Sequence, residues 1–415
     1  MLSVNKTLSK MLIDKKLIPL TFGGLGIGIT EFVMMGLLPD IAKDLDITIP
    51  TAGHLISSYA FGVVVGAPIL AIIAAKYPPK RILIGLMILF TVFNAISAFS
   101  PSYFTLLIAR FFSGLPHGAF FGVGSVVASR IAPKGKEAQA VSLMFAGLTI
   151  ANLFGVPLGT FIGHNYSWRY SFGIVAIVGI ITLLSLKYWL PNLQSEKKTD
   201  VKTELSFFAK REAWIIILMI SIGTGGLFCW ISYIAPLMTE VAGFEEGNVT
   251  YILMLAGFGM LVGNFFGGYL ADKFSPAKAS IALLLAMCAI LIVVFFVSSN
   301  PVLALVTTFF TGAIAFALAA PIQMLMIRTA KGSEMIAASA SQASFNIGNA
   351  LGALFGGFPL VYGLSYNYPS LVGAIMALTG SFFAYWLIRR FAKTKAEQEE
   401  ATTAVKVQEE VAELV

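Results

Sequence analysis

Two ionisable residues of this sequence lie well inside long apolar stretches, where charge is rare. Glu31 is the only carboxylate at such a depth, and Arg110 is the only cation. A charge in hydrocarbon is costly, so it normally has a partner or a task. Each residue lies seven positions from one end of its stretch, at Leu38 and Tyr103 respectively. At about 1.5 Å per residue, both are predicted roughly 10 Å inside the same boundary, where they could meet across a helix pair.

This pair is suited to proton transfer. Glu31 can take up and release a proton, and the approach or withdrawal of Arg110 would control how easily that proton leaves. The alternative is a static buried ion pair that only orients two helices. His117 follows Arg110 by two helical turns and lies on nearly the same helix face, so it could relay protons or contact a ligand. Packing is the alternative role for His117.

A set of amide side chains offers uncharged polarity instead. Gln342, Asn346 and Asn349 follow one another at i, i+4 and i+7, which places them on one stripe of a helix. Amides both donate and accept hydrogen bonds, as sugar hydroxyls require. We interpret Gln323, Gln342 and Asn346 as candidates for a substrate cavity, and Asn349, which repeats as Asn152, as scaffold. Hydrogen bonds between helices would explain the same residues.

Other side chains fit chemistry less well. Trp230 and Tyr233 could stack on a ligand, or they could be core or interfacial aromatics. Cys229 and Cys288 both lie in apolar stretches and are interpreted as packing residues rather than as a disulfide or metal pair. The sequence has no Walker loop, zinc-binding histidine pair or paired carboxylates in an apolar stretch. These absences argue against an enzyme and against ATP-driven transport, and we expect neither a metal nor a cofactor.

Membrane-spanning helices must position all of these residues. The composition is 57% hydrophobic and 12% charged, and the mean hydropathy is +0.85, which is too apolar for a soluble core of this size. Runs of about 20 apolar residues, each long enough to cross a bilayer, recur at 17–38, 53–75, 82–99, 103–129, 139–162, 171–190, 214–239, 249–271, 279–297, 302–326, 336–360 and 370–388. We predict an all-α integral membrane protein with twelve transmembrane helices.

The sequence also repeats itself without a gap at an offset of 197 residues. Repeated pairs include Pro39 and Pro236, Gly62 and Gly259, Glu137 and Glu334, Asn152 and Asn349, and Gly155 and Gly352. A repeat of this length indicates duplicated domains. We predict two pseudo-symmetric six-helix bundles at residues 1–194 and 212–392, joined by a linker at 195–211 and followed by a solvated or loosely helical tail at 393–415.

The charges inside the apolar stretches do not follow this repeat. Glu31 corresponds to Phe228, Arg110 to Thr307 and His117 to Ile314. Residues needed only for packing would more easily survive in both halves. The asymmetry therefore favours a functional role for these charges.

Lysine and arginine positions predict the orientation, because short cytoplasmic loops retain positive charge. Basic residues cluster before the first apolar stretch and in alternate loops, whereas the other loops keep only Lys43 and Arg169. We therefore expect both termini in the cytoplasm and a parallel rather than an inverted repeat. We interpret the first stretch as a helix rather than a cleaved signal peptide. The net charge of +7 is explained by topology, and nucleic acid is not an expected partner.

One loop motif resembles the cytoplasmic signature of the major facilitator superfamily. From Gly268 the chain reads Gly-Tyr-Leu-Ala-Asp-Lys, which ends with Asp272 and Lys273. Glycine allows close helix contact there, and an aspartate at a helix end can accept from backbone amides or pair with basic groups of the neighbouring bundle. We expect these residues to latch one conformation. The corresponding position in the first half is Ala75, so the aspartate is missing there.

Two further motifs extend the resemblance. Arg110 precedes Gly114 by four residues, as in a superfamily motif with a buried arginine. Gly155, Pro157 and Gly159 resemble the glycine and proline signature of antiporters in this superfamily. A kinked packing surface is the alternative explanation for these residues.

The stretches 114–124, 151–160 and 167–170 resemble the bacterial arabinose-efflux permeases of the drug:proton antiporter branch. This resemblance implies alternating access between two bundles and export, from the bacterial cytoplasmic (inner) membrane, of a sugar or a small amphipathic compound. It implies a proton gradient as the energy source. We expect the protein to work as a monomer in the lipid bilayer. A multidrug exporter of lipophilic compounds and a proton/sugar symporter remain alternatives, with a channel or a membrane-embedded enzyme less favoured.

Overall fold

The computed structural model describes residues 15–47, 49–74, 76–193, 205–330 and 332–413, and every regular element in them is helical. Eleven helical segments in these residues are long and apolar enough to cross a membrane. Large apolar side chains such as Phe161, Phe266 and Phe310 are exposed on the outside of the molecule, as lipid contact requires. The predicted all-α membrane fold is thereby confirmed.

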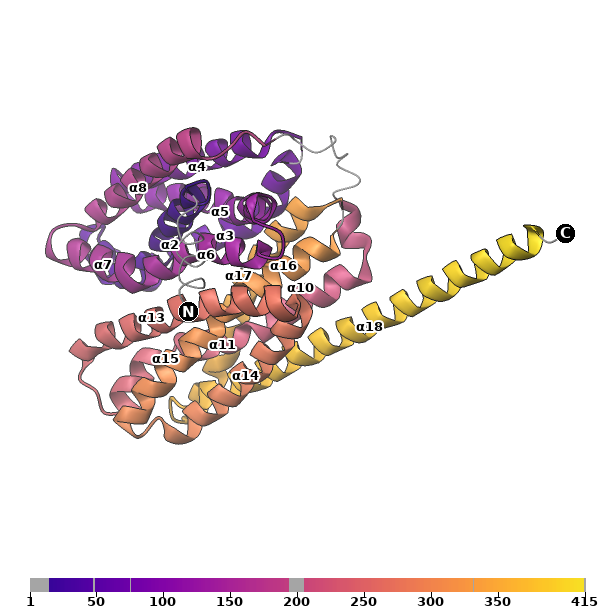
Figure 1. Ribbon diagram of the computed structural model, residues 1–415. Coiled ribbons are helices and arrows are strands. Elements are labelled where there is room, and N and C mark those ends of the chain that lie inside the picture. Colours follow the sequence, from indigo (N-terminus) through magenta and orange to yellow (C-terminus); the bar gives the residue numbers. More distant parts are fainter. Residues whose placement is uncertain (1–14, 48, 75, 194–204, 331, 414–415) are drawn as a thin grey trace, which may run out of the picture.

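The helices of the first half gather in one part of the molecule, coloured indigo to magenta in Figure 1. They are α2 (Ile18–Asp44), α3 (Ile49–Ala74), α4 (Pro79–Ala98), α5 (Tyr103–Ile131), α6 (Glu137–Ile150), the π-turn η1 (Ala151–Gly155), α7 (Val156–Asn165) and α8 (Trp168–Trp189). Their core includes the fully buried rings of Phe90, Phe120 and Phe172.

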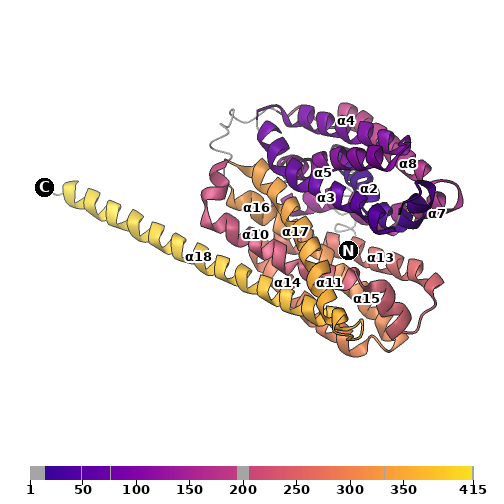
Figure 2. The same cartoon turned by 180° about the vertical axis from the view of Figure 1, so that it is seen from behind.

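The helices of the second half form the other part (Figures 1 and 2). They are α10 (Arg211–Gly223), α11 (Gly225–Ile231), α12 (Ile234–Pro236), the π-turn η3 (Leu237–Val241), α13 (Val249–Phe274), α14 (Pro276–Val297), α15 (Pro301–Ala317), α16 (Ala319–Thr329), α17 (Glu334–Val361) and α18 (Tyr368–Glu413), with short 3-10 turns η2 (Ser206–Ala209) and η4 (Glu246–Asn248). The last helix continues far beyond the body of the molecule (Figure 2).

One of the twelve predicted spans differs from the others in composition. In the described residues, α17 has the length of a span but is not among the eleven apolar ones. Its buried face carries polar side chains, including Ser341, Gln342 and Ser344. Because α17 packs against α3 and α5 of the other half as well as α10 and α11 of its own, much of its surface faces protein. A helix in that position does not need an apolar surface all round.

Several spans are interrupted by proline or glycine, as a membrane helix tolerates when neighbours cover the freed backbone groups. The predicted helix over 214–239 is divided into α10, α11, α12 and η3, with Pro236 just before η3. The π-turn η1 directly precedes Pro157 in the first turn of α7. Breaks of this kind are typical sites of helix bending.

The two groups of helices match the predicted pair of bundles. The exact boundaries at 1–194 and 212–392 stay predictions. Most of the predicted linker, residues 195–204, lies outside the described residues.

Candidate functional site

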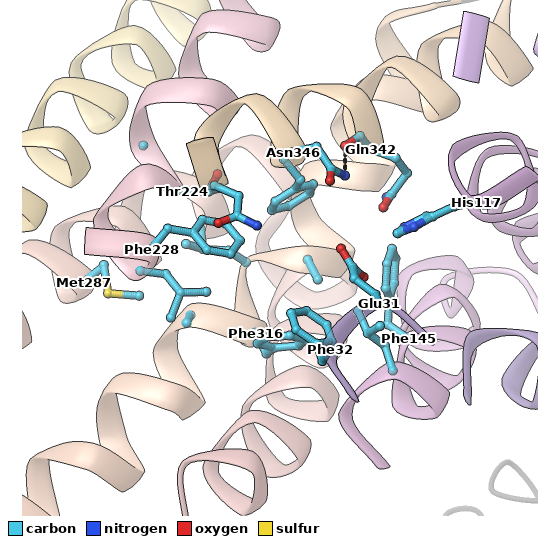
Figure 3. Close-up of a pocket in the computed structure, with 18 residues that line it drawn as sticks. Glu31, Phe32, His117, Phe145, Thr224, Phe228, Met287, Phe316, Gln342 and Asn346 are labelled. Carbon is cyan, nitrogen blue, oxygen red and sulfur yellow. Dashed lines mark hydrogen bonds between the residues drawn. The ribbon is translucent and has the colours of Figure 1, made fainter. Parts of the chain in front are cut away.

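A cavity lies between the two halves of the molecule, and both halves line it (Figure 3). Its volume is about 740 Å³, counting its open mouth. The first half contributes Glu31 and Phe32 from α2, His117 from α5, and Phe145 and Leu148 from α6. The second half contributes Gly223, Thr224, Leu227, Phe228, Met287, Ala315, Phe316, Leu318, Ala319, Gln342, Phe345, Asn346 and Asn349. A largely apolar cavity with a few polar groups is typical of a small-molecule site.

The cavity follows the internal repeat of the sequence. Glu31 and Phe228, which are 197 positions apart, both line it. Phe145 and Gln342, separated by the same offset, line it as well. Equivalent positions of the two halves thus face one space, but the first half supplies the ionisable groups and the second half supplies the amides.

Glu31 lies on α2 with its carboxylate directed into the cavity (Figure 3). Within the described part of the chain, no hydrogen bond or ion pair joins it to another side chain. The carboxylate is therefore available to a proton or to a ligand that enters the cavity.

Arg110 is fully buried, and its guanidinium lies near two aromatic rings. The centroid of the Tyr59 ring is 4.4 Å from its Cζ atom, and that of Phe172 is 5.6 Å away. One nitrogen, Nη1, donates to the hydroxyl of Thr30 at 2.9 Å. The guanidinium thus contacts the residue that precedes Glu31 on α2.

The expected meeting of Glu31 and Arg110 is only partly found. The helices α2 and α5 do pack against each other, and the two charges interact through space. Among the described ion pairs, however, none joins these two side chains, because Arg110 turns to Thr30 and to the aromatic rings. Two of its nitrogens, Nε and Nη2, have no hydrogen-bond partner among the residues that the structure describes.

His117 is connected to Arg110 through Tyr59, a residue that sequence reasoning missed. The ring of His117 lines the cavity, and its Nδ1 atom is 3.1 Å from the Tyr59 hydroxyl. The same tyrosine carries the guanidinium of Arg110 on its face. A chain of contacts therefore runs from buried Arg110 through Tyr59 to the cavity. The signal in the sequence is a polar aromatic residue inside the second apolar stretch.

Asn94 was missed as well. Its side chain is fully buried on α4 and accepts a hydrogen bond of 2.6 Å from the Thr30 hydroxyl. Its own amide group donates to the Phe90 carbonyl at 2.8 Å. Thr30, which accepts from Arg110, is thereby held in a fixed orientation next to Glu31. Nothing in the spacing of the sequence connects Asn94 with Thr30.

The predicted cavity amides fall into two layers. Gln342 and Asn346 line the cavity, and so does Asn349, which was interpreted as scaffold. Gln323 lies behind Gln342, fully buried, and accepts a hydrogen bond of 3.2 Å from its amide nitrogen. Asn152, the repeat partner of Asn349, donates to a carbonyl of its own helix and does not line the cavity.

The two predicted aromatics lie away from the cavity lining. Trp230 is 1% exposed and packs in the core of the second half. The Tyr233 hydroxyl donates to the Ala353 carbonyl at 2.8 Å, which ties α17 to the region between α11 and α12. Both residues support the helices of the second half in this conformation.

The loop motif joins the two halves at one end of the molecule. The Asp272 carboxylate, at the end of α13, accepts from the backbone N–H groups of Ala138 and Gln139, each at 3.0 Å, and from the Gln139 side chain at 3.1 Å. These amides belong to the first turn of α6 in the other half, where a negative charge is favourable. Lys273 instead lies over the rings of Tyr269 and Phe274 on its own helix.

Close packing extends this junction along α13. A Cβ atom at Gly268 would lie 2.8 Å from the Ser142 Cβ atom, so only glycine allows this approach without a shift. One turn earlier, Asn264 donates to the Ser142 carbonyl at 2.7 Å. We refer to Asn264, Gly268 and Asp272 with their partners on α6 as the α13–α6 junction. The corresponding first-half position, Ala75, lies outside the described residues.

The glycines of the antiporter-like signature lie at a helix contact. A Cβ atom at Gly159 would lie 2.7 Å from a methyl group of Val33, and Gly155 faces Ile29 in the same way. Pro157 lies between these two glycines, two residues after the end of the π-turn η1. This placement brings α7 against α2, the helix that carries Glu31.

No group of three or more histidine, cysteine, aspartate or glutamate side chains in the described residues could hold a metal ion. The cavity chemistry is therefore built from one carboxylate, one imidazole, amides, a hydroxyl and aromatic rings.

Comparison with known proteins identifies the relatives of this chain. The family model described as Major Facilitator Superfamily matches residues 20–340 and 258–412. The "Putative transporter AraJ" of Escherichia coli (strain K12) is 39% identical over 384 residues, covering 92% of this chain and 96% of that protein. The "Probable sugar efflux transporter" of Helicobacter pylori (strain ATCC 700392 / 26695) is 31% identical over 368 residues, covering 88% and 93%.

A solved structure gives the same assignment of the fold. The fucose:proton symporter FucP of E. coli superposes with a TM-score of 0.73, covering 89% of this chain and 98% of that chain, at 18% sequence identity.

Proposed function

The chain belongs to the major facilitator superfamily, and on that premise we propose that it exports a sugar or a small amphipathic compound in exchange for protons. The observation that carries this proposal is the position of Glu31. It is an unpaired carboxylate in a cavity that both halves line, among side chains suited to a small neutral ligand. A carboxylate in that place can hold either a proton or a ligand hydroxyl, and such competition couples two fluxes.

Alternating access supplies the movement in this proposal. The α13–α6 junction holds the halves together at one end through backbone amides and a carboxylate. The ion pair between Arg328 and Glu137, at 3.8 Å, spans the halves near the same junction. Release of these contacts would let the two halves rock about the cavity and expose Glu31 to the other side.

The buried residues behind Glu31 would control its proton. Arg110 holds Thr30 in place and keeps two donors free, so its charge acts on Glu31 without occupying the carboxylate. Tyr59 connects Arg110 with His117. His117 then gives the cavity a second group that can exchange protons.

The setting of the protein follows from charge distribution and family. We place both termini in the cytoplasm and the protein in the bacterial inner membrane, because basic residues concentrate on one side of the spans. The protein would work as a monomer, with the proton gradient in place of a cofactor. Small-molecule substrate, protons and lipid are its partners in this account.

Export of lipophilic compounds is the second candidate function. Among the described residues, five phenylalanines line the cavity, and a surface of this kind adapts to varied apolar ligands. A proton/sugar symporter would use the same residues, because direction depends on binding order and gradients.

The proposal is tested with proteoliposomes that contain a pH-sensitive dye and an imposed proton gradient. They are challenged with arabinose, other small sugars and a panel of lipophilic cations. Proton movement evoked by sugars supports sugar exchange, and movement evoked only by the cations supports the second candidate. Absence of proton movement with every compound, while labelled compound still crosses the membrane, would contradict proton coupling.

A further inference from the structure

The cavity amides have fixed orientations, because a backbone carbonyl determines the direction of a hydrogen-bond chain behind them. A carbonyl oxygen can only accept, so the Gln323 atom that lies 3.0 Å from the Ala338 carbonyl must be its amide nitrogen, Nε2. The oxygen of Gln323, Oε1, therefore faces the other way. There it accepts from the Ser341 hydroxyl and, at 3.2 Å, from Gln342.

This chain fixes which atom Gln342 presents to the cavity. One of the two N–H groups of its amide donates to Gln323, which turns its oxygen away from Gln323 and toward the cavity, where it can accept from a ligand. In Figure 3 the Gln342 side chain extends into the space beside His117 and Glu31. Gln323 is fully buried and Gln342 is 5% exposed, so reversal of either amide would leave buried donors or acceptors facing each other.

Two further lining residues are oriented by carbonyls in the same way. The Asn346 amide nitrogen donates to the Gln342 backbone carbonyl at 3.0 Å, which leaves the Asn346 oxygen free. Thr224 donates its single hydroxyl proton to the Ile220 carbonyl at 2.7 Å and keeps only lone pairs for a ligand. In its ionised state the Glu31 carboxylate also only accepts, and with it four groups of the lining can act as hydrogen-bond acceptors.

Resting on the proposed export function, we propose that the cavity recognises a neutral polyhydroxyl ligand, such as a monosaccharide or its alkyl glycoside, through the ligand's O–H donors. Hydroxyl protons of the ligand meet the oxygens of Gln342, Asn346 and Glu31, and its C–H face packs against the phenylalanine rings. Gln323 is a positioning residue, because it keeps the Gln342 oxygen turned toward the ligand without lining the cavity.

Sugar analogues distinguish an acceptor lining from a donor lining. Replacing a hydroxyl by fluorine removes the donor but retains a weak acceptor, and replacing it by hydrogen removes both. Where the protein atom is an acceptor, the deoxy and the deoxyfluoro analogue should bind equally weakly, each about tenfold worse than the parent sugar. Where the protein atom is a donor, the deoxyfluoro analogue should keep part of its affinity.

The experiment measures equilibrium binding of such a series to the purified full chain in detergent, beginning with arabinose and its alkyl glycosides. The methionine of Gln323→Met has a similar length but makes no such hydrogen bonds, so the Gln342 amide should lose its fixed orientation. The ratio of the affinities for the parent sugar and its deoxyfluoro analogue should then fall severalfold. Thr308→Val is the matched control, because Thr308 is fully buried in the same half and its hydroxyl donates to the Ala304 carbonyl of its own helix. This control variant should discriminate between the parent sugar and its deoxyfluoro analogues as the wild type does.

Three results would overturn this inference. They are deoxyfluoro analogues that bind like the parent sugar, a Gln323→Met variant that binds but discriminates like the wild type, and a wild-type protein that binds none of the series. If Gln323→Met fails to fold, the wild-type comparison of deoxy and deoxyfluoro analogues still decides the question. Binding is measured without a membrane or a proton gradient, so its result does not depend on proton coupling. The proposed coupling can therefore fail while this inference stands, and this inference can fail while the coupling stands.

Discussion

At the scale of single residues, the contacts around Arg110 differ from a simple ion pair. Its guanidinium is held by Thr30 and two aromatic rings, while the Glu31 carboxylate faces the cavity. Burial of an unpaired arginine is expensive. The aromatic faces of Tyr59 and Phe172 offset part of that cost through cation–π contact. This arrangement keeps the positive charge near Glu31 without blocking the carboxylate.

Tyr59 gives the first prediction. Tyr59→Phe keeps the ring beneath Arg110 but removes the hydroxyl that contacts His117, at a cost of about 0.5–1.5 kcal/mol for one hydrogen bond. We expect this variant to insert normally and to alter the pH profile of transport. The change should disappear when His117→Ala is already present, because the two residues act as one unit. Transport rates of the two single variants and the double variant across pH provide the measurement. Independent, additive effects would contradict the predicted connection.

At the scale of elements, helix ends and helix contacts determine which conformation the two halves adopt. The α13–α6 junction places a carboxylate on the first turn of α6, and α17 packs against α3 and α5 of the other half. At the far end of α2, Asp44 bonds to Arg169 and Trp168, which ties α2 to the start of α8. The Asp272 contact thus involves the start of α6, and the Asp44 contact involves the end of α2.

Asp272→Asn tests the junction. The amide side chain lacks the charge that favours the N-terminus of α6 and offers one acceptor atom instead of two. We expect the closed junction to lose about 1–2 kcal/mol, a shift of roughly 5- to 30-fold in population. Spin labels on α6 and α13 would report it as a longer distance distribution. Lys273→Gln serves as the control and should leave the distribution unchanged, because in the described part of the chain the Lys273 ammonium lies over two rings of its own helix. An unchanged distribution in Asp272→Asn would contradict the latch.

The Asp44 contact predicts a dependence of stability on pH. The hydrogen bond from Arg169 holds the pKa of Asp44 below its usual value. A carboxylate whose folded pKa is lowered contributes stability above its unfolded pKa, about 3.9, and loses it as the pH falls through the folded value. Asp44→Asn should therefore lower stability near neutral pH by less than about 1 kcal/mol, since both partners are partly exposed.

Thermal unfolding in detergent between about pH 3 and pH 7 checks this prediction. The variant and the wild type should converge as the pH falls. A difference between them that stays constant over this range would show that the carboxylate charge contributes nothing.

At the scale of the whole molecule, the sequence predicts the architecture well and the site less well. The apolar runs and the repeat indicate two helical bundles because hydropathy and duplication are properties of the chain itself. Contacts such as Thr30 with Asn94 and Tyr59 with His117 depend on which faces of separate helices pack together. The residue pattern of a single sequence does not show this. The sequence shows the spacing of the polar groups in α17, but the orientation of Gln342 depends on the Ala338 carbonyl through Gln323.

The same limit explains the aromatic residues. The position of Trp230 and Tyr233 in an apolar run allows two predictions, stacking on a ligand or packing in the core. The breaks that divide α10, α11 and α12 turn Trp230 into the core and bring Tyr233 against α17. The phenylalanines that do line the cavity, such as Phe145 and Phe228, carry no signal that separates them from other core residues.

The central claim is that Glu31 couples proton movement to substrate movement from a cavity shared by both halves. The most direct measurement compares wild type and Glu31→Gln in proteoliposomes that contain a pH-sensitive dye, at equal amounts of inserted protein. The account predicts that substrate evokes proton release in the wild type and that this release is lost in Glu31→Gln while insertion is intact. Unchanged proton release in Glu31→Gln would contradict it.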